Sequence, residues 1–155
     1  EPLIKKEFSR IMSLKDGLKK MSKSEVSDLS RINLTDDKDQ IINKIKKAKT
    51  DTLPLPSKIE ELENRPEAKN LIGIYSSLMN NTLQKTIDEF AGKNFSEFKE
   101  KLSEIVVNEI NPISLKIKEL LDDKVFLEKI LKDGYEKANE IASKKIKKIH
   151  EIVGF

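Results

Sequence analysis

The sequence predicts an all-α protein, built mainly as a bundle of about four or five helices. Apolar residues recur at helical spacing through nearly all of the chain after residue 36, and no convincing strand pattern follows residue 14. With 155 residues, the chain has the length of about one domain. Apolar residues make up 37% of it, which is enough to form a core even though another 37% of the residues are charged.

The first helix is expected within the stretch DDKDQIINKIKKAKTD, residues 36–51. Its apolar residues share one face, Thr35 or Asp36 is the expected N-cap, and lysines gather at the C-terminal end. The acidic start of this helix also admits a metal site, but N-terminal capping explains it more simply. The apolar face consists of Ile41, Ile42, Ile45 and Ala48, and the acidic residues are Asp36, Asp37 and Asp39.

A break in the periodicity follows the first helix. Pro54 and Pro56 prevent a helix from continuing, so residues 51–65 are expected to form a linker with a short helical turn in KIEELE. Pro66 suits the first position of the next helix, which should end at the two asparagines of residues 80–81. The apolar stripe of that helix consists of Ala68, Leu71, Ile72, Tyr75, Leu78 and Met79.

Three further helical segments are expected towards the C-terminus. The first is short and is closed by Gly92, and the second is long and should be kinked or interrupted at Pro112. The last begins at a cap on Asp122 or Asp123 and carries an apolar stripe to its end. Aromatic side chains at helical spacing could stack on nucleic-acid bases but more often belong to a core; these are Tyr75, Phe90, Phe95, Phe98 and Tyr135.

Composition excludes several classes of site. The chain has no cysteine, hence no disulfide or thiolate metal site, and its single histidine, His150, gives no basis for a Ser-His-Asp or Cys-His arrangement. We expect no metal site in the chain. The net charge of +3 permits a polyanionic partner without requiring one. No apolar run reaches the roughly 18 residues that span a membrane, and no apolar signal region opens the chain, so a cytoplasmic protein is expected.

One short motif carries chemistry. KMSKS occupies Lys20–Ser24 and, with Asp16, Gly17 and Ser27 around it, should form a mobile loop. It could be a solvated basic turn, and this composition would produce the pentapeptide by chance in roughly one such sequence in a thousand or two. Two lysines three residues apart can instead reach one pyrophosphate group, with hydroxyls and loop amides adding donors. Donors that tighten as charge builds on departing pyrophosphate would lower the barrier to adenylyl transfer.

The motif belongs to a longer pattern. The chain reads RIMSLKDGLKKMSKSEVSDLSRINLTDD, followed in order by IxxKIxxAxTD, RPEAKNLIGIY, EFAGKNFSEFKEKL, NPI and GYEKANEIASKKIKKIHEIVGF. Over almost its whole length it resembles tryptophanyl-tRNA synthetase, a class I aminoacyl-tRNA synthetase. Tyrosyl-tRNA synthetase shares the loop but not the sequence that follows it.

The resemblance implies ATP-dependent activation of tryptophan and its transfer to tRNA-Trp, with Mg²⁺ accompanying ATP. It makes Lys23 the main pyrophosphate ligand, assisted by Lys20, and both are the implied catalytic residues. The backbone of Ile11 would touch the adenine, and the remaining implied ATP-binding residues of the loop are Met21, Ser22 and Ser24. Glu25 departs from the aspartate that family members often carry, which leaves the turn after the loop less certain.

The resemblance also implies an architecture. Residues 1–50 would be the end of an α/β nucleotide-binding catalytic domain, residues 51–65 a linker, and residues 66–155 the helical anticodon-binding bundle. The first fourteen residues carry too few apolar side chains to found a domain, and no HIGH-like sequence or tryptophan pocket is present. We therefore expect a C-terminal fragment that forms no tryptophanyl-adenylate by itself. Family members are homodimers, whereas the fragment would be a monomer or a weak associate.

Two alternatives remain open at this stage. The chain could be a non-catalytic helical RNA-binding or interaction module in which the loop is incidental, or another nucleotidyltransferase with a lysine-serine loop. A basic cluster on the last helix bears on the choice, because it is either a solvated face or a contact to tRNA phosphates whose strength would fall steeply with salt. The cluster consists of Lys144, Lys145, Lys147 and Lys148.

Overall fold

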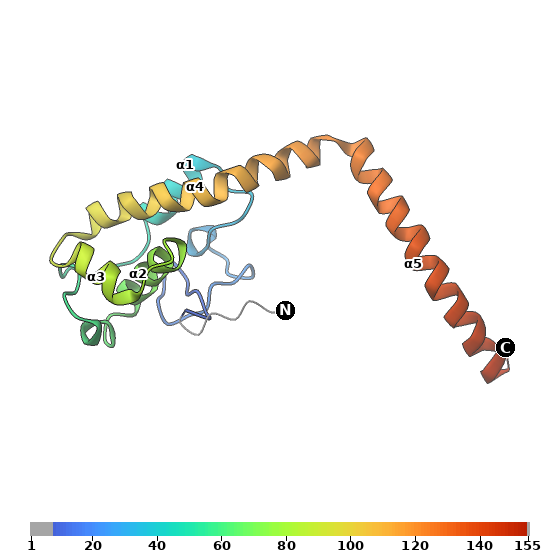
Figure 1. Ribbon diagram of the computed structural model, residues 1–155, viewed down its shortest axis with the longest axis horizontal. Helices are drawn as coiled ribbons and strands as arrows, with labels where there is room; N and C mark the ends of the chain where they lie inside the picture. The colour runs from blue at the N-terminus through green and yellow to red at the C-terminus, as the bar shows by residue number, and fades with distance from the viewer. Residues whose placement is uncertain (1–7, 155) are drawn as a thin grey trace. The chain divides into compact units, whose positions relative to one another are not determined.

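The computed structural model describes residues 8–154, and the opening residues 1–7 of the segment expected to end a catalytic domain lie outside that range. The described chain is helical, and within it the only β-type pairing is an isolated antiparallel bridge between Met12 and Lys20. The predicted all-α class is therefore confirmed. The helices, drawn in Figure 1, are α1 (Lys38–Lys46), α2 (Pro66–Leu78), α3 (Leu83–Phe90), α4 (Phe95–Asp122) and α5 (Lys124–Val153), with 3₁₀ turns η1 (Asp28–Ser30) and η2 (Ile59–Leu62).

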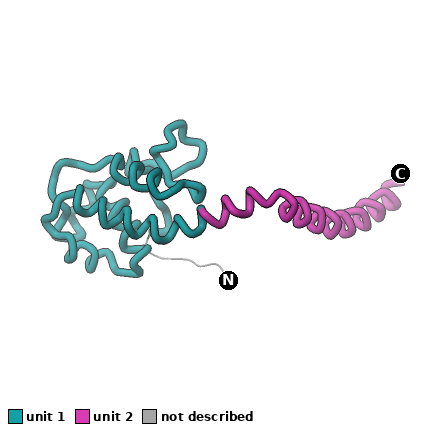
Figure 2. The backbone as a smooth tube through the Cα atoms, turned by 90° about the horizontal axis from the view of Figure 1, so that it is seen from above, with its two compact units in different colours: residues 1–114 teal, residues 115–155 magenta. Residues whose placement is uncertain are grey.

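The chain divides into two compact units, residues 1–114 and 115–155 (Figure 2). Every buried side chain of the described residues belongs to the first unit, where α1 to α4 and the segments between them enclose one apolar core. In the second unit, no side chain of residues 115–154 is buried. Across residues 8–154, no helix combines the length and the apolar character needed to cross a membrane.

Helix α1 is capped one residue later than predicted. Asp37 is the N-cap; its Oδ1 accepts a hydrogen bond from Gln40 N, and the Gln40 side chain accepts from Asp37 N, so the two form a capping box. The expectation of Thr35 or Asp36 as the cap is wrong, because the Asp36 side chain turns inward to a buried lysine. At the other end, Lys99 of α4 donates to the Ala48 carbonyl at 2.6 Å.

The segment between α1 and α2 contains the predicted helical turn, as η2. The segment packs against the core, because Leu55, between the two prolines, and Leu62, in η2, are each 2% exposed. Arg65, just before α2, binds Asp51 with two charge-assisted hydrogen bonds of 2.7 and 2.8 Å. This pair ties the two ends of residues 51–65 together.

Helices α2, α3 and α4 carry the centre of the core. Pro66 occupies the first turn of α2 and Gly92 follows α3 with φ of 73°, as the sequence predicted. The rings of Tyr75, Phe90 and Phe98 contact one another with centroids 4.9–5.6 Å apart, which confirms them as core residues. Helix α4 continues through Pro112, so the expected interruption there is wrong; a single proline removes only one backbone hydrogen bond from a long helix.

Helix α5 begins at the predicted cap, Asp123, whose side chain accepts from Phe126 N at 3.0 Å, and ends at Gly154 with φ of 83°. Its apolar stripe is nevertheless exposed. Tyr135, expected in a core, is 66% exposed, so that expectation is wrong. The physical reason is that the unit of residues 115–155 consists of α5 and the end of α4, which is too little structure to enclose a side chain on all sides.

Candidate functional site

The KMSKS segment, Lys20–Ser24, is an exposed loop that leaves a short backbone pairing. Residues 11–13 pair with residues 19–21, since Ser13 N donates to Lys19 O at 2.7 Å and Met21 N donates to Ile11 O at 3.0 Å. Leu14, 2% exposed, fastens this pairing to the rest of the unit: its N–H donates to Ser30 O and its carbonyl accepts from Lys49 N. The predicted loop therefore starts from a fixed base.

The turn that joins the two paired segments lies directly on α2. Leu18 N donates to Asp16 Oδ1 at 3.0 Å, and Lys19 N donates to Asp16 O at 3.1 Å, so Asp16 shapes the turn. A Cβ added to Gly17 would lie 2.5 Å from the Pro66 carbonyl carbon, which no real side chain tolerates. Glycine is required here because the two backbones approach too closely for any larger residue.

The loop lines a hollow of about 850 Å³ together with the backbone segment predicted to contact the adenine. Of the six residues expected to bind ATP, the hollow brings together Ile11, Lys20, Met21, Ser22 and Lys23. Ser24 does not line it, but its hydroxyl lies 2.8 Å from that of Ser22, within the same turn. The far wall comes from the residues that follow the loop, among them Arg31, Asn33 and Thr35.

The charges around this hollow are positive. Arg10, Arg31, Lys20 and Lys23 line it, and the described lining residues include no carboxylate. Arg31 is already engaged, with Asp28 at 3.0 Å and the Glu25 carbonyl at 2.9 Å. Within residues 8–154, neither Lys20 nor Lys23 forms an ion pair, and both side chains are exposed, so their ammonium groups are available to an anionic ligand.

The residues that follow the loop are anchored by a buried lysine that sequence reasoning did not identify. Lys44 of α1 is 3% exposed, and its Nζ lies 2.6 Å from carboxylate oxygens of both Asp28 and Asp36. The pKa of the Asp28 carboxyl is lowered chiefly by the hydrogen bond from Lys44 and next by the hydrogen bond from Asn33. The available signal was the position of Lys44 on the same helical face as Ile41 and Ala48, where a lysine must be paired to be buried.

Two of the acidic residues at the start of α1, Asp36 and Asp37, have structural roles. Residues 8–154 contain no group of three or more potential histidine, cysteine or carboxylate ligands. Asp37 caps the helix, as the simpler interpretation expected for this group, and Asp36 pairs with Lys44.

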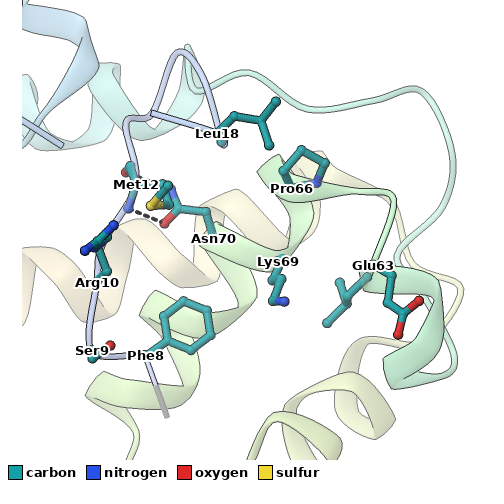
Figure 3. A pocket seen from close by; sticks show the side chains of 11 residues that line it. Phe8, Ser9, Arg10, Met12, Leu18, Glu63, Pro66, Lys69 and Asn70 are labelled. Carbon is teal, nitrogen blue, oxygen red and sulfur yellow. Dashed lines mark hydrogen bonds between the residues drawn. The ribbon is translucent and has the colours of Figure 1, made fainter. Parts of the chain in front are cut away.

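The start of the loop is positioned by a second residue that sequence reasoning did not identify, Asn70 of α2. Its side-chain amide is 2.9 Å from both the N–H and the carbonyl of Met12, 58 positions earlier in the chain (Figure 3). Nothing in the local sequence around Asn70 indicates this contact, because it depends on how α2 meets residues 10–12.

The predicted tRNA-binding lysines lie near the end of α5. All four are exposed, and Lys144 pairs with Glu140 at 2.7 Å, one turn earlier. An exposed pair of this kind contributes little to stability, so the cluster remains available to solvent or to an anion.

The chain resembles known synthetases in sequence. A family model for class I tRNA synthetases (W and Y) matches residues 1–111. Tryptophan–tRNA ligase from Agrobacterium fabrum is 52% identical over 155 residues, which is all of this chain and 44% of that protein. The Rickettsia felis enzyme of the same name is 51% identical and is matched over 46% of its length. The chain thus spans about half the length of these relatives.

The fold matches as well. The structure of tryptophanyl-tRNA synthetase from Campylobacter jejuni complexed with ADP and tryptophan is similar, with a TM-score of 0.76 and 26% identity over 97% of this chain and 45% of that one. The synthetase from Mycoplasma pneumoniae gives a TM-score of 0.71 and 25% identity over 97% of this chain and 45% of its own.

Proposed function

The chain belongs to the class I tRNA synthetases that serve tryptophan and tyrosine, and we propose that it works within a longer tryptophan–tRNA ligase. In that enzyme ATP activates tryptophan, and the activated amino acid is transferred to tRNA-Trp. The present 155 residues supply the loop that binds pyrophosphate and helices that bind tRNA. Other parts of the enzyme supply the tryptophan pocket and the rest of the ATP site, so the isolated chain forms no adenylate.

One observation carries this proposal: Lys20 and Lys23, which form no ion pair within residues 8–154, line the same hollow as the Ile11 segment. The segments before and after their loop are held to the rest of the unit. In adenylate formation a carboxylate oxygen of tryptophan attacks the α-phosphorus of ATP, and the bond from that phosphorus to the pyrophosphate oxygen breaks. Negative charge grows on the departing pyrophosphate. Lys23, assisted by Lys20, neutralises that charge as it develops, which lowers the barrier.

The other residues of the loop have smaller roles in the proposal. The Ser22 and Ser24 hydroxyls, 2.8 Å apart, present donors beside the two lysines. Met21, which follows Lys20, is half-buried, and its side chain packs against the core. This contact holds the start of the loop against the rest of the unit. The backbone of Ile11 contacts the adenine.

Mg²⁺ is expected with ATP, but these residues do not fit a protein-held Mg²⁺. Magnesium prefers carboxylate and water oxygens, and the described lining of the hollow carries none of the former. The ion would therefore be held by the phosphates and by parts of the enzyme outside this chain.

The remaining roles follow the same proposal. Residues 1–50 complete the catalytic domain, residues 51–65 link it to the helices, and residues 66–155 bind the anticodon region of tRNA, with the α5 lysines on its phosphates. The full-length enzyme is a cytoplasmic homodimer, and the isolated 155 residues are a monomer or a weak associate. Sedimentation equilibrium of the isolated chain tests the last point.

The decisive experiment measures tryptophan-dependent ATP–pyrophosphate exchange in the full-length enzyme. Lys23→Ala should lower kcat by about 10²–10³-fold, the typical cost of one such donor, and the double variant with Lys20→Ala should be slower still. Lys19→Ala is the matched control, because Lys19 is exposed beside the loop but does not line the hollow, and it should retain wild-type exchange. Wild-type exchange in the double variant would refute the proposal and favour a non-catalytic RNA-binding module.

A further inference from the structure

We propose that Asn70 of α2 is a positioning residue for the pyrophosphate-binding loop, acting through the backbone of Met12 on the segment that carries Lys20. The inference rests on the proposed function of the loop. It concerns a side chain that lies 50 positions after Lys20 in sequence and does not line the loop's hollow.

The hydrogen-bond pattern of the backbone pairing makes Asn70 necessary. Met12 and Lys20 face each other as a non-hydrogen-bonded pair, because the two bonds of the bridge join residues 13 to 19 and 21 to 11. The N–H and the carbonyl of Met12 therefore point away from the loop, where a third strand would lie. Asn70 occupies that place, with Oδ1 accepting from Met12 N and Nδ2 donating to Met12 O, both at 2.9 Å (Figure 3).

Asparagine fits this position by its chemistry as well as its length. Its amide offers one acceptor and one donor side by side, which is what the exposed edge of an extended residue requires. An aspartate would place a second oxygen against the Met12 carbonyl, and an alanine would leave both Met12 groups without a partner at a site where Asn70 itself is 2% exposed.

The pairing needs this support because it is very short. A single bridge between two segments is marginal in water, and here one side of it must stay exposed to receive a ligand. Helix α2 is rigidly held, since Leu71 and Ile72, next to Asn70, are each 1% exposed in the core. Asn70 thus fixes the position of Met12, and through the pairing that of Lys20, to the core, while Lys23, three residues further on, remains free to follow the phosphates.

A loop base held in this way affects the chemical step more than substrate binding. A displacement of about 1 Å in a catalytic group can cost about a hundredfold in rate. Removal of the Asn70 amide should therefore lower kcat for adenylate formation and leave the tryptophan site, which lies outside this chain in the proposal, unaffected.

The test compares Asn70→Ala and Asn70→Asp with Ser76→Ala in the full-length enzyme. Ser76 is the matched control: it is a buried polar residue on the same helix, 4% exposed, and its hydroxyl bonds to Ile72 O and Thr86 Oγ1, away from the loop. Melting temperature and the kcat and KM values of ATP–pyrophosphate exchange are measured for each variant, well below the lowest melting temperature.

Both Asn70 variants should show kcat lowered by about ten- to a hundredfold with the tryptophan KM unchanged, whereas Ser76→Ala should melt earlier with unchanged kinetics. Wild-type kcat in Asn70→Ala, or an equal kinetic loss in Ser76→Ala, would overturn the inference. Lys23→Ala measured alongside separates the two failures. If Lys23→Ala lowers kcat by about 10²–10³-fold while Asn70→Ala has no effect, only the positioning role is wrong; if Lys23→Ala too has no effect, the proposed function of the loop fails.

Discussion

The ammonium nitrogen of Lys44 lies 2.6 Å from Oδ2 of Asp36, and both side chains are almost completely buried. The same nitrogen lies 2.6 Å from Asp28, in the turn that follows the KMSKS loop. Burying charges is costly unless they are paired, so this cluster holds residues 28–36 against α1 only while its partners are all present.

Lys44→Ala should therefore destabilise the chain strongly. Removing one partner of a buried pair leaves an uncompensated charge on Asp36 and typically costs about 3–5 kcal/mol. Urea unfolding of the purified chain at neutral pH measures the loss. The control Lys46→Ala, on an exposed position of the same helix, should change stability by less than about 0.5 kcal/mol.

A second variant distinguishes charge from packing. Replacing both partners, as Lys44→Met with Asp36→Leu, should recover much of the stability lost in Lys44→Ala, because no buried charge remains unpaired. A double variant as unstable as Lys44→Ala would show that the unpaired charge is not the main cost, and would point instead to packing and to the hydrogen bonds that Asp36 accepts from Asn33 N and Nδ2.

The pair between Arg65 and Asp51 predicts a pH-dependent contribution to stability. The hydrogen bonds from Arg65, 10% exposed, lower the pKa of the Asp51 carboxyl below its ordinary value of 3.8. A carboxyl with a lowered folded-state pKa stabilises the fold above its unfolded pKa and loses that contribution as pH falls through the folded one. Its contribution should thus be complete at about pH 5–7 and decline below about pH 3.8.

Asp51→Asn tests this directly. Urea unfolding at several pH values from about 7 to about 2.5 should show the wild type more stable by about 2 kcal/mol near neutrality, with the difference shrinking below about pH 4. Asp133→Asn, on the exposed surface of α5, serves as the control and should track the wild type. A stability difference that is independent of pH would contradict the assignment.

Gly17→Ala should separate the turn before the loop from α2. The new Cβ would lie 2.5 Å from the Pro66 carbonyl carbon and 2.6 Å from Glu67 N. Both are backbone atoms of α2, which cannot move aside as the end of a flexible side chain could. Overpacking of this kind costs about 1–3 kcal/mol, so the first unit should melt earlier by circular dichroism.

Gly134→Ala gives the opposite expectation and is the natural comparison. A Cβ at Gly134, inside α5, meets nothing within 4 Å, and alanine is a better helix former than glycine by about 1 kcal/mol. The helical circular-dichroism signal should persist to higher temperature. If Gly134→Ala lost as much stability as Gly17→Ala, the close approach of two backbones would not explain the loss in Gly17→Ala.

The lysines near the end of α5, which we propose to bind tRNA phosphates, should contribute to tRNA affinity. Replacing Lys144, Lys145, Lys147 and Lys148 by alanine in the full-length enzyme should weaken tRNA-Trp binding and flatten its salt dependence, with the slope reduced by about 0.7–0.9 for each phosphate that is no longer neutralised. Filter binding at two salt concentrations measures both. The matched control removes the same charge from the same helix, at Lys124, Lys129, Lys132 and Lys137, and equal effects would show that the cluster is only a solvated face.

Local interactions along the chain determined much of this fold. Pro66 and Gly92 fix the start of one helix and the end of another because each constrains the backbone where it stands. Helical spacing of apolar residues identified Tyr75, Phe90 and Phe98 as core, and the pentapeptide at residues 20–24 identified the candidate site. Such features depend on neighbours within a few positions and can be read without knowing the fold.

The tertiary structure alone decided which polar side chains hold that site in place. Asn70 reaches Met12 across 58 positions, and Lys44 reaches Asp28 across 16. The helical spacing of Lys44 indicates that it is buried, but the local sequence does not indicate the partner of either residue. It also decided that Tyr135 is exposed although its helix carries an apolar stripe, since burial depends on what packs against a helix and not on its own pattern. Helix formation is a local property, whereas burial and pairing of charges are settled only when distant segments meet.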